Sequence, residues 1–302
     1  MSKIFETVKK AGGEIPDLIR SVAGERDARA PMGDLPCEGI GAPPGLSKAP
    51  VESPALPGGS AAIRGIRTIH LRVPGPSPIL PFENGHSRPS EQYRILRTRI
   101  GQHPRRPHLI LVSSPESGDG KTVTAINTAA ALSLKSDGHV LLLDGDFRKS
   151  AVHHQMGLPE APGLAEVLKG DSTIEDAMVR TQEFPNLFVI CAGAPPSNPV
   201  ELFDSPNWET LCTRMRSAFR YVVLDSPPVG AVADYDLIQA ACDGVVLVLR
   251  PDHTNRQLHA KALKIIPRAK LLGVVLNCVP DWSLAKHAGS GYYYSGEKVY
   301  QG

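Results

Sequence analysis

The sequence predicts an α/β fold, a doubly wound and mostly parallel sheet with helices on both faces. Two observations predict it. From residue 89 onward, continuous Val/Leu/Ile runs alternate with helical patterns, which is typical of strands buried on both faces of a parallel sheet. Acidic or Gly-rich segments follow several of these runs directly, at the strand ends where open α/β sheets bind ligands.

The expected elements follow in chain order. Ser90 is expected to cap a helix through EQYRILRTRI. A strand at HLILVSS, a helix at TVTAINTAAALSL and a strand at HVLLLDGD come next. Four further strands are expected at NLFVICAG, YVVLDSPP, GVVLVLR and LLGVVLNCV, with helices between them. This alternation predicts one folded domain over residues 89–280.

Three segments flank this domain. Residues 1–28 predict one amphipathic helix, with Ile4, Phe5 and Val8 on one face, that docks on a partner or touches a membrane surface; the alternative is a poorly ordered terminus. Residues 29–88 are rich in proline and predict a disordered, flexible linker. A short strand fits residues 68–73 but has no evident partner. Residues 281–302 are polar and predict a flexible, Tyr-rich tail.

Bulk composition excludes several functional classes. The chain has 302 residues, 41% of them hydrophobic, which suffices for one large α/β core. A net charge of +2 argues against a general nucleic-acid partner. The five cysteines are scattered without a CxxC pair, so buried thiols in a reducing compartment are expected rather than zinc or disulfides. No segment reaches about 18 apolar residues or resembles a signal peptide, which predicts a cytoplasmic protein.

The strongest chemical signal is SSPESGDGKT at residues 113–122, where a strand ends and a helix begins. Gly118 and Gly120 allow the backbone N–H groups to face an anion, Lys121 reaches the outer phosphates, and Thr122 offers its hydroxyl to Mg²⁺. The general pattern needs glycine where this chain has Pro115. The order strand, Gly-rich loop and helix still favours a P-loop NTPase fold that binds ATP over a Gly-rich loop with an incidental lysine. The expected nucleotide-binding residues are Glu116, Ser117, Gly118, Asp119, Gly120, Lys121, Thr122 and Val123.

Carboxylates follow two further strands. Asp144 and Asp146 end LLLDGD at a spacing of two, and Arg148 continues that alternation. The two carboxylates are expected to lie beside the phosphates and their metal, or to accept a proton from the substrate. The alternative is that they only cap the next turn. Asp225 ends the run YVVLD, where a P-loop site needs an acid to hold Mg²⁺ through its water shell.

The set GDGKT, LLLDGDFR and VVLDSPP resembles the Walker A, A′ and B motifs of the bacterial tyrosine kinases that accompany exopolysaccharide and capsule synthesis. Asp144, Asp146 and Arg148 match the family's DxDxR, and Asp225 and Pro228 match its DxxP. The resemblance covers about residues 89–302. It implies an ATP-dependent protein-tyrosine autokinase that acts on its own C-terminal tyrosines.

Two further features fit this resemblance. Glu91, Arg94 and Arg97 match an ExxRxxR motif that builds the subunit interface of a ring in the family; the alternative is a solvated charged stripe. The family also ends in a tyrosine-rich tail that is phosphorylated in trans, and the alternative here is a sticky recognition tail. The expected phosphate acceptors are Tyr292, Tyr293, Tyr294 and Tyr300.

The resemblance also implies roles and partners. Lys121, Asp144, Asp146 and Arg148 are the implied catalytic residues, with Asp144 as the base for the phenol. Thr122, Asp146 and Asp225 are the implied metal site, although the residues alone allow Asp144 and Asp146 to exchange roles. The implied partners are other copies of the chain in a ring, a membrane activator of the polysaccharide co-polymerase type and a tyrosine phosphatase. No activator is fused to this chain, so the separate cytoplasmic type is expected, at the membrane's inner face only through its partner.

Two other functions remain open from the residues. Partition and septum-placement ATPases share the P-loop, but they carry a signature lysine five positions before the P-loop lysine, where this chain has Glu116. A nucleotide-gated regulator of polysaccharide export, with the tail as a docking peptide, is not an enzyme and would carry the same motifs.

Overall fold

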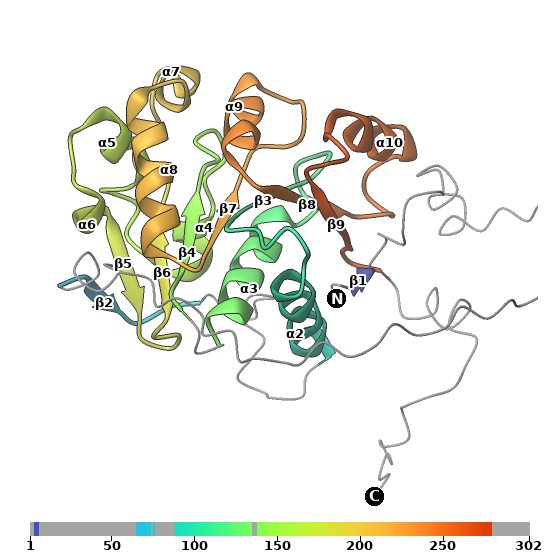
Figure 1. Ribbon diagram of the computed structural model, residues 1–302, viewed down its shortest axis with the longest axis horizontal. Coiled ribbons are helices and arrows are strands. Elements are labelled where there is room, and N and C mark those ends of the chain that lie inside the picture. Colours follow the sequence, from blue (N-terminus) through green and yellow to red (C-terminus); the bar gives the residue numbers. More distant parts are fainter. Residues whose placement is uncertain (1–2, 6–64, 74, 76–87, 135–137, 280–302) are drawn as a thin grey trace, which may run out of the picture. The chain divides into compact units, whose positions relative to one another are not determined.

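The computed structural model describes residues 3–5, 65–73, 75, 88–134 and 138–279 (Figure 1). Its strands are β1 (Lys3–Phe5), β2 (Arg67–Ile69), β3 (Leu109–Ser113), β4 (Val140–Asp144), β5 (Met178–Thr181), β6 (Leu187–Ile190), β7 (Tyr221–Asp225), β8 (Gly244–Leu249) and β9 (Leu271–Leu276). These strands form one nine-stranded sheet in the order β1-β9-β8-β3-β7-β4-β6-β5-β2. Neighbours run parallel except β1 with β9 and β5 with β6, so the sheet is mostly parallel, as predicted.

Helices connect the strands. They are α2 (Arg88–Gly101), α3 (Lys121–Ser133), α4 (Val152–Met156), α5 (Leu164–Lys169), α6 (Ile174–Ala177), α7 (Pro199–Phe203), α8 (Pro206–Ala218), α9 (Ala233–Ala241) and α10 (Arg256–Ile265). Relative to β3, β4 lies beyond β7 on one side and β8 lies on the other. The chain therefore winds in both directions from β3, and the predicted doubly wound fold is confirmed. None of the helices in the described ranges combines the length and the apolar composition of a membrane-spanning segment.

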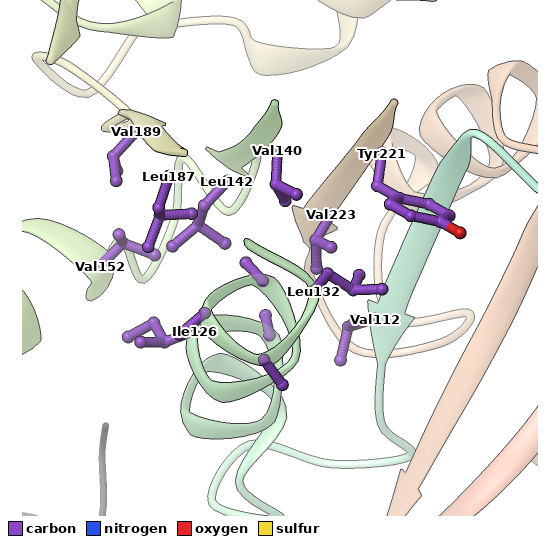
Figure 2. Close-up of a cluster of buried hydrophobic side chains, with 14 of the residues drawn as sticks. Val112, Ile126, Leu132, Val140, Leu142, Val152, Leu187, Val189, Tyr221 and Val223 are labelled. Atoms are coloured by element: carbon purple, nitrogen blue, oxygen red, sulfur yellow. The ribbon is translucent and has the colours of Figure 1, made fainter. Parts of the chain in front are cut away.

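The core lies on both faces of the sheet. Strands β3, β4, β7 and β8 are buried along their whole length, which explains their continuous apolar sequences. Alternate side chains such as Val112, Leu142 and Val223 belong to one buried cluster with Ile126 and Leu132 of α3 (Figure 2). The intervening residues, such as Leu224, are equally buried on the opposite face. Of the 13 residues of α3, 12 are buried, so this helix is fixed in the core.

Two expectations about the N-terminal third need correction. The predicted helix over residues 1–28 is wrong at Lys3–Phe5, which forms β1 antiparallel to β9; residues 6–28 lie outside the described residues. Three apolar and basic residues carry too little periodicity to separate a helix from a strand. The short strand that fitted residues 68–73 is present at Arg67–Ile69 and has β5 as its parallel partner, so the predicted linker over residues 29–88 is wrong there. Leu71 and Val73 also pack against the core cluster.

The cysteines follow the prediction with one exception. Cys191, Cys212 and Cys242 are buried free thiols, as expected. Cys278 is exposed, because it follows the end of β9 in a turn with a φ of 55° and leaves the sheet. Cys37 lies outside the described residues.

Candidate nucleotide and phosphotransfer site

The motif residues meet at the carboxyl edge of three adjacent strands. β7 lies between β3 and β4, and in this register Asp225 is the partner of both Val112 and Asp144. The loop after β3, the acids at the end of β4 and the last residue of β7 are therefore neighbours, although more than 100 residues separate the first from the last. The predicted convergence of these segments is confirmed.

The loop before α3 has the backbone conformation that its glycines predict. Gly118 has a φ of 95° and Gly120 a φ of 94°, both in the left-handed region that favours glycine. Gly120 is also the residue that caps the N-terminus of α3. A Cβ atom on Gly120 would overlap the side-chain amide of Asn277. Both conformation and space therefore require glycine at the point where the loop turns into the helix.

Lys121 lies between two carboxylates and is 6% exposed. Its Nζ is 2.8 Å from Asp146 Oδ2 and 3.7 Å from Asp225 Oδ1. Burial alone would lower the pKa of Lys121, but the carboxylates of Asp225 and Asp146 outweigh it and raise the pKa above its usual value. The lysine is therefore charged at neutral pH.

Thr122 and Asp225 form the next contact. Thr122 Oγ1 donates a hydrogen bond of 2.6 Å to Asp225 Oδ2. Asp225 is completely buried, and burial raises its pKa, against the opposing influence of the Lys121 ammonium and the Thr122 hydroxyl. A hydroxyl and a carboxylate held together beside a P-loop lysine are the oxygen donors that Mg²⁺ prefers.

Asp144 is occupied by backbone hydrogen bonds. Its Oδ1 accepts from the N–H of Asp146 at 3.1 Å, and its Oδ2 accepts from the N–H groups of Ala151 and Val152, each at 3.2 Å. These bonds hold the turn between β4 and α4. Burial, with the nearby Asp225 carboxylate, raises the pKa of Asp144 to about 7. The carboxyl group thus stabilises the turn and titrates near neutrality.

Arg148 follows the acids at the end of β4 and forms an ion pair with Asp234 of α9. Its Nε donates to Oδ2 of Asp234 at 2.9 Å, and its Nη2 lies 3.4 Å from Oδ1. Asp234 belongs to α9 and is 1% exposed. Next to Arg148, the ring of Phe147 stacks on Phe203 with centroids 4.9 Å apart. These contacts fix the segment after β4 against α7 and α9, and neither partner was predicted from the sequence.

The other predicted loop residues line the same turn. Glu116 is exposed, and its carbonyl accepts from Ser114 Oγ at 2.6 Å. Ser117 Oγ lies 3.4 Å from Lys149 Nζ. Val123 is partly buried and packs against the core from α3. Asp119 turns its side chain into the protein, toward residues that follow β8.

The predicted interface motif lies on the outer face of α2. Tyr93, Leu96 and Ile100 bury the inner face of this helix. Glu91 is exposed and pairs with Arg94 at 3.4 Å, and both Arg94 and Arg97 are partly exposed. The predicted acceptor tyrosines, Tyr292, Tyr293, Tyr294 and Tyr300, lie outside the described residues.

Known proteins align with about two thirds of the chain. No family model matches the chain. Tyrosine-protein kinase YwqD of Bacillus subtilis (strain 168) is 36% identical over 208 residues, 68% of this chain and 86% of YwqD. Tyrosine-protein kinase CpsD of Streptococcus agalactiae is 31% identical over 207 residues, 67% of this chain and 89% of CpsD.

Solved structures with the same fold also include tyrosine kinase domains. The crystal structure of the chimerical protein CapA2B2 superposes with a TM-score of 0.64 at 32% identity, over 72% of this chain and 94% of that one. The BceF tyrosine kinase domain has a TM-score of 0.56 at 32% identity, over 64% of this chain and 78% of that one. The kinase domain of the Escherichia coli tyrosine kinase ETK, at 24% identity and a TM-score of 0.58, shares the fold.

Proposed function

The chain belongs to the bacterial tyrosine-protein kinases and is itself a protein-tyrosine kinase, and we propose that it phosphorylates its own C-terminal tyrosines with ATP and Mg²⁺. One observation carries the proposal: Lys121 Nζ lies 2.8 Å from Asp146 and 3.7 Å from Asp225, directly after the glycine-rich loop. The acceptors are Tyr292, Tyr293, Tyr294 and Tyr300.

The described residues fit a magnesium-bound nucleotide. Asp225 Oδ1 is buried and accepts no hydrogen bond from them, so this oxygen is available to a cation. No group of three or more His, Cys, Asp or Glu side chains in the described ranges suits a metal on its own. Mg²⁺ needs fewer protein ligands when it binds with phosphates, because phosphate oxygens and waters complete its octahedral shell.

Each site residue then has a defined task. Lys121 would bind the outer phosphates through its charged ammonium, while Thr122, Asp146 and Asp225 would hold the metal. When bound there, Mg²⁺ would supply positive charge that stabilises the transferring phosphoryl group. Asp144 accepts the phenol proton as the tyrosine oxygen bonds to the γ-phosphorus and the bond from that phosphorus to the β-phosphate oxygen breaks. Arg148 acts by fixing the segment after β4 through Asp234.

Transfer takes place between copies of the chain. The partly exposed Arg94 and Arg97, with Glu91, form the subunit interface of a ring, and the tail of one subunit enters the site of its neighbour. The kinase works in the cytoplasm at the inner face of the membrane. A polysaccharide co-polymerase activates it there, a tyrosine phosphatase reverses the modification, and the cycle regulates exopolysaccharide synthesis and export.

The test is to incubate purified protein with ATP and Mg²⁺ beside a Lys121→Met variant and to map phosphate by mass spectrometry. Phosphotyrosine at residues 292–294 or 300 is expected in the wild type and reduced at least about 100-fold in the variant, because the charge that holds the phosphates is lost. Lys169→Met changes an exposed lysine of α5 and is expected to match the wild type.

The assay also separates the competing functions. A tail that stays unmodified, even with a membrane-activator peptide, contradicts the autokinase. ATP hydrolysis under those conditions would favour the partition-type ATPase. Nucleotide binding without turnover would favour the nucleotide-gated regulator.

The pH dependence of kcat/KM tests the base. Because a base must be deprotonated and Asp144 has a pKa of about 7, kcat/KM is expected to fall as the pH drops below about 7 and to level off above it. Asp144→Asn is expected to lose about 100- to 10,000-fold in kcat. An Asp144→Asn enzyme with wild-type kcat would assign the proton to another group, and Asp146→Asn in parallel tests whether that group is Asp146.

A further inference from the structure

Asp119 sits in the middle of the glycine-rich loop but binds protein with both carboxylate oxygens. The side chain is fully buried. Its Oδ2 accepts the N–H of Glu116 at 3.1 Å, within the loop itself. Its Oδ1 accepts from Thr254 Oγ1 at 2.6 Å and lies 3.3 Å from His253 Nδ1. The carboxylate therefore ties the loop to the segment between β8 and α10.

The carbonyl groups of the loop are bound in a similar way. Asn277, the first residue after β9, donates from Nδ2 to the carbonyl of Asp119 at 2.8 Å. Arg250, the first residue after β8, lies with Nη1 3.3 Å from the carbonyl of Gly118. Asn277 is itself held, because its N–H donates to the carbonyl of Leu249 at 2.8 Å.

These contacts determine where the loop N–H groups point. In a trans peptide the C=O and the following N–H point in opposite directions. The carbonyl of Asp119 is directed at Asn277, so the N–H of Gly120 points away from Asn277. In the same way, the Gly118 carbonyl is directed at Arg250, so the N–H of Asp119 points away from Arg250. An anion-binding loop needs its N–H groups turned inward together, and bonds that hold the carbonyls outward achieve this.

We propose that Asp119, Thr254 and Asn277 form a loop brace, a set of positioning residues that keeps the glycine-rich loop in its phosphate-binding conformation. This inference rests on the proposed nucleotide site. The side chain of Asp119 therefore points away from the proposed phosphate position, because its carboxylate binds Glu116 and Thr254 within the protein. The brace also gives a function to the ends of β8 and β9, which carry none of the recognised motifs.

Thr254→Val tests the brace, because valine keeps the shape of threonine and removes the hydroxyl. The dissociation constant for a fluorescent ADP analogue with Mg²⁺ is expected to rise about 10- to 100-fold, the range for a lost hydrogen bond to a charged group. KM for ATP is expected to rise in proportion, with kcat at saturation nearly unchanged. Thr254→Ser is expected to restore both.

Thr213→Val is the matched control. Thr213 Oγ1 donates to the carbonyl of Glu209 on an exposed face of α8, so the same substitution removes a hydrogen bond away from the loop. Hydrogen exchange without nucleotide is the second readout. Thr254→Val is expected to speed exchange of the amides at residues 116–120 and to leave those of β3 and β7 unchanged.

Several results would overturn the inference. Thr254→Val protein that binds the ADP analogue as tightly as wild type, or whose loop amides exchange as slowly, contradicts the brace. A general loss of protection across β3 and β7 would show that Thr254 supports the fold instead. Wild-type protein that is folded but fails to bind the analogue contradicts the proposed nucleotide site itself, and the brace falls with it.

Discussion

Gly120→Ala is expected to abolish nucleotide binding while the protein remains folded. A Cβ atom at this position would overlap the side-chain amide of Asn277, and the φ of 94° is unfavourable for any residue with a Cβ. The loop must then move at the start of α3, where its N–H groups would meet the phosphates. In a thermal unfolding assay, nucleotide at about 100 times its wild-type dissociation constant should raise the Tm of the wild type by about 5–10 °C and that of the variant not at all.

Gly170→Ala separates backbone strain from steric overlap. Gly170 has a φ of 84° at the end of α5, yet a Cβ atom there would meet nothing within 4 Å. This variant is expected to lose about 1 kcal/mol, or about 2–4 °C in Tm, and to keep the full shift on adding nucleotide. A Gly120→Ala protein that retains the nucleotide-dependent shift would contradict the assignment of this loop.

Asp225→Asn is expected to make the protein without nucleotide more stable and to remove its kinase activity. Burial raises the pKa of Asp225, so the charged carboxylate costs free energy in the folded state. Asparagine removes that charge and can still accept the hydrogen bond from Thr122. A gain of about 1 kcal/mol, or about 2–4 °C in Tm, is expected, together with the loss of the Mg²⁺-dependent shift on adding nucleotide.

The sign of the pH dependence checks this reasoning. Because the folded-state pKa of Asp225 is raised, the wild type loses stability as the pH rises from the unfolded-state pKa through the folded-state pKa. The advantage of Asp225→Asn should therefore be largest at alkaline pH and disappear in acid. Asp171→Asn, which changes an exposed aspartate of the described chain, is the control substitution. An Asp225→Asn protein that is less stable than wild type at every pH would mean that the lost ion pair with Lys121 outweighs burial.

The central strands could be predicted because burial on both faces of the sheet produces a simple sequence pattern. Strands such as β3 and β7 are buried on both faces, which produces an unbroken apolar run that ends at a polar residue. The intervening helices follow from the same alternation. The fold class and the positions of these strands along the chain therefore depend on local signals that a sequence retains, whereas their order in the sheet comes from the structure.

The edge strands left a weaker signal: a strand fitted residues 68–73 but had no evident partner, and residues 1–28 predicted a helix where β1 forms. β2 is three residues long, two of them exposed, and its partner β5 lies more than 100 residues away. β1 is also three residues long. Pairing of this kind is decided by tertiary contact, and a segment of three residues is too short to show a periodicity.

The candidate site divides in the same way. Lys121, Asp146 and Asp225 could be predicted because each occupies a strand end or the first turn of a helix, where topology forces convergence. Thr254 and Asn277 follow strands whose ends carry no motif, and they became visible only through their contacts with Asp119. Residues that position a loop are recognised by their contacts with it, and their type alone does not reveal this role.

The sheet order also sets a minimum length for the chain between β1 and β2. These strands lie at opposite edges of a nine-stranded sheet, about 38 Å apart at the usual strand spacing. Residues 6–66, 61 in all, join them, with an extended reach of about 200 Å. About a dozen residues would span the distance across the sheet in a straight line. The connection is therefore several times longer than the straight distance between the two edges of the sheet requires.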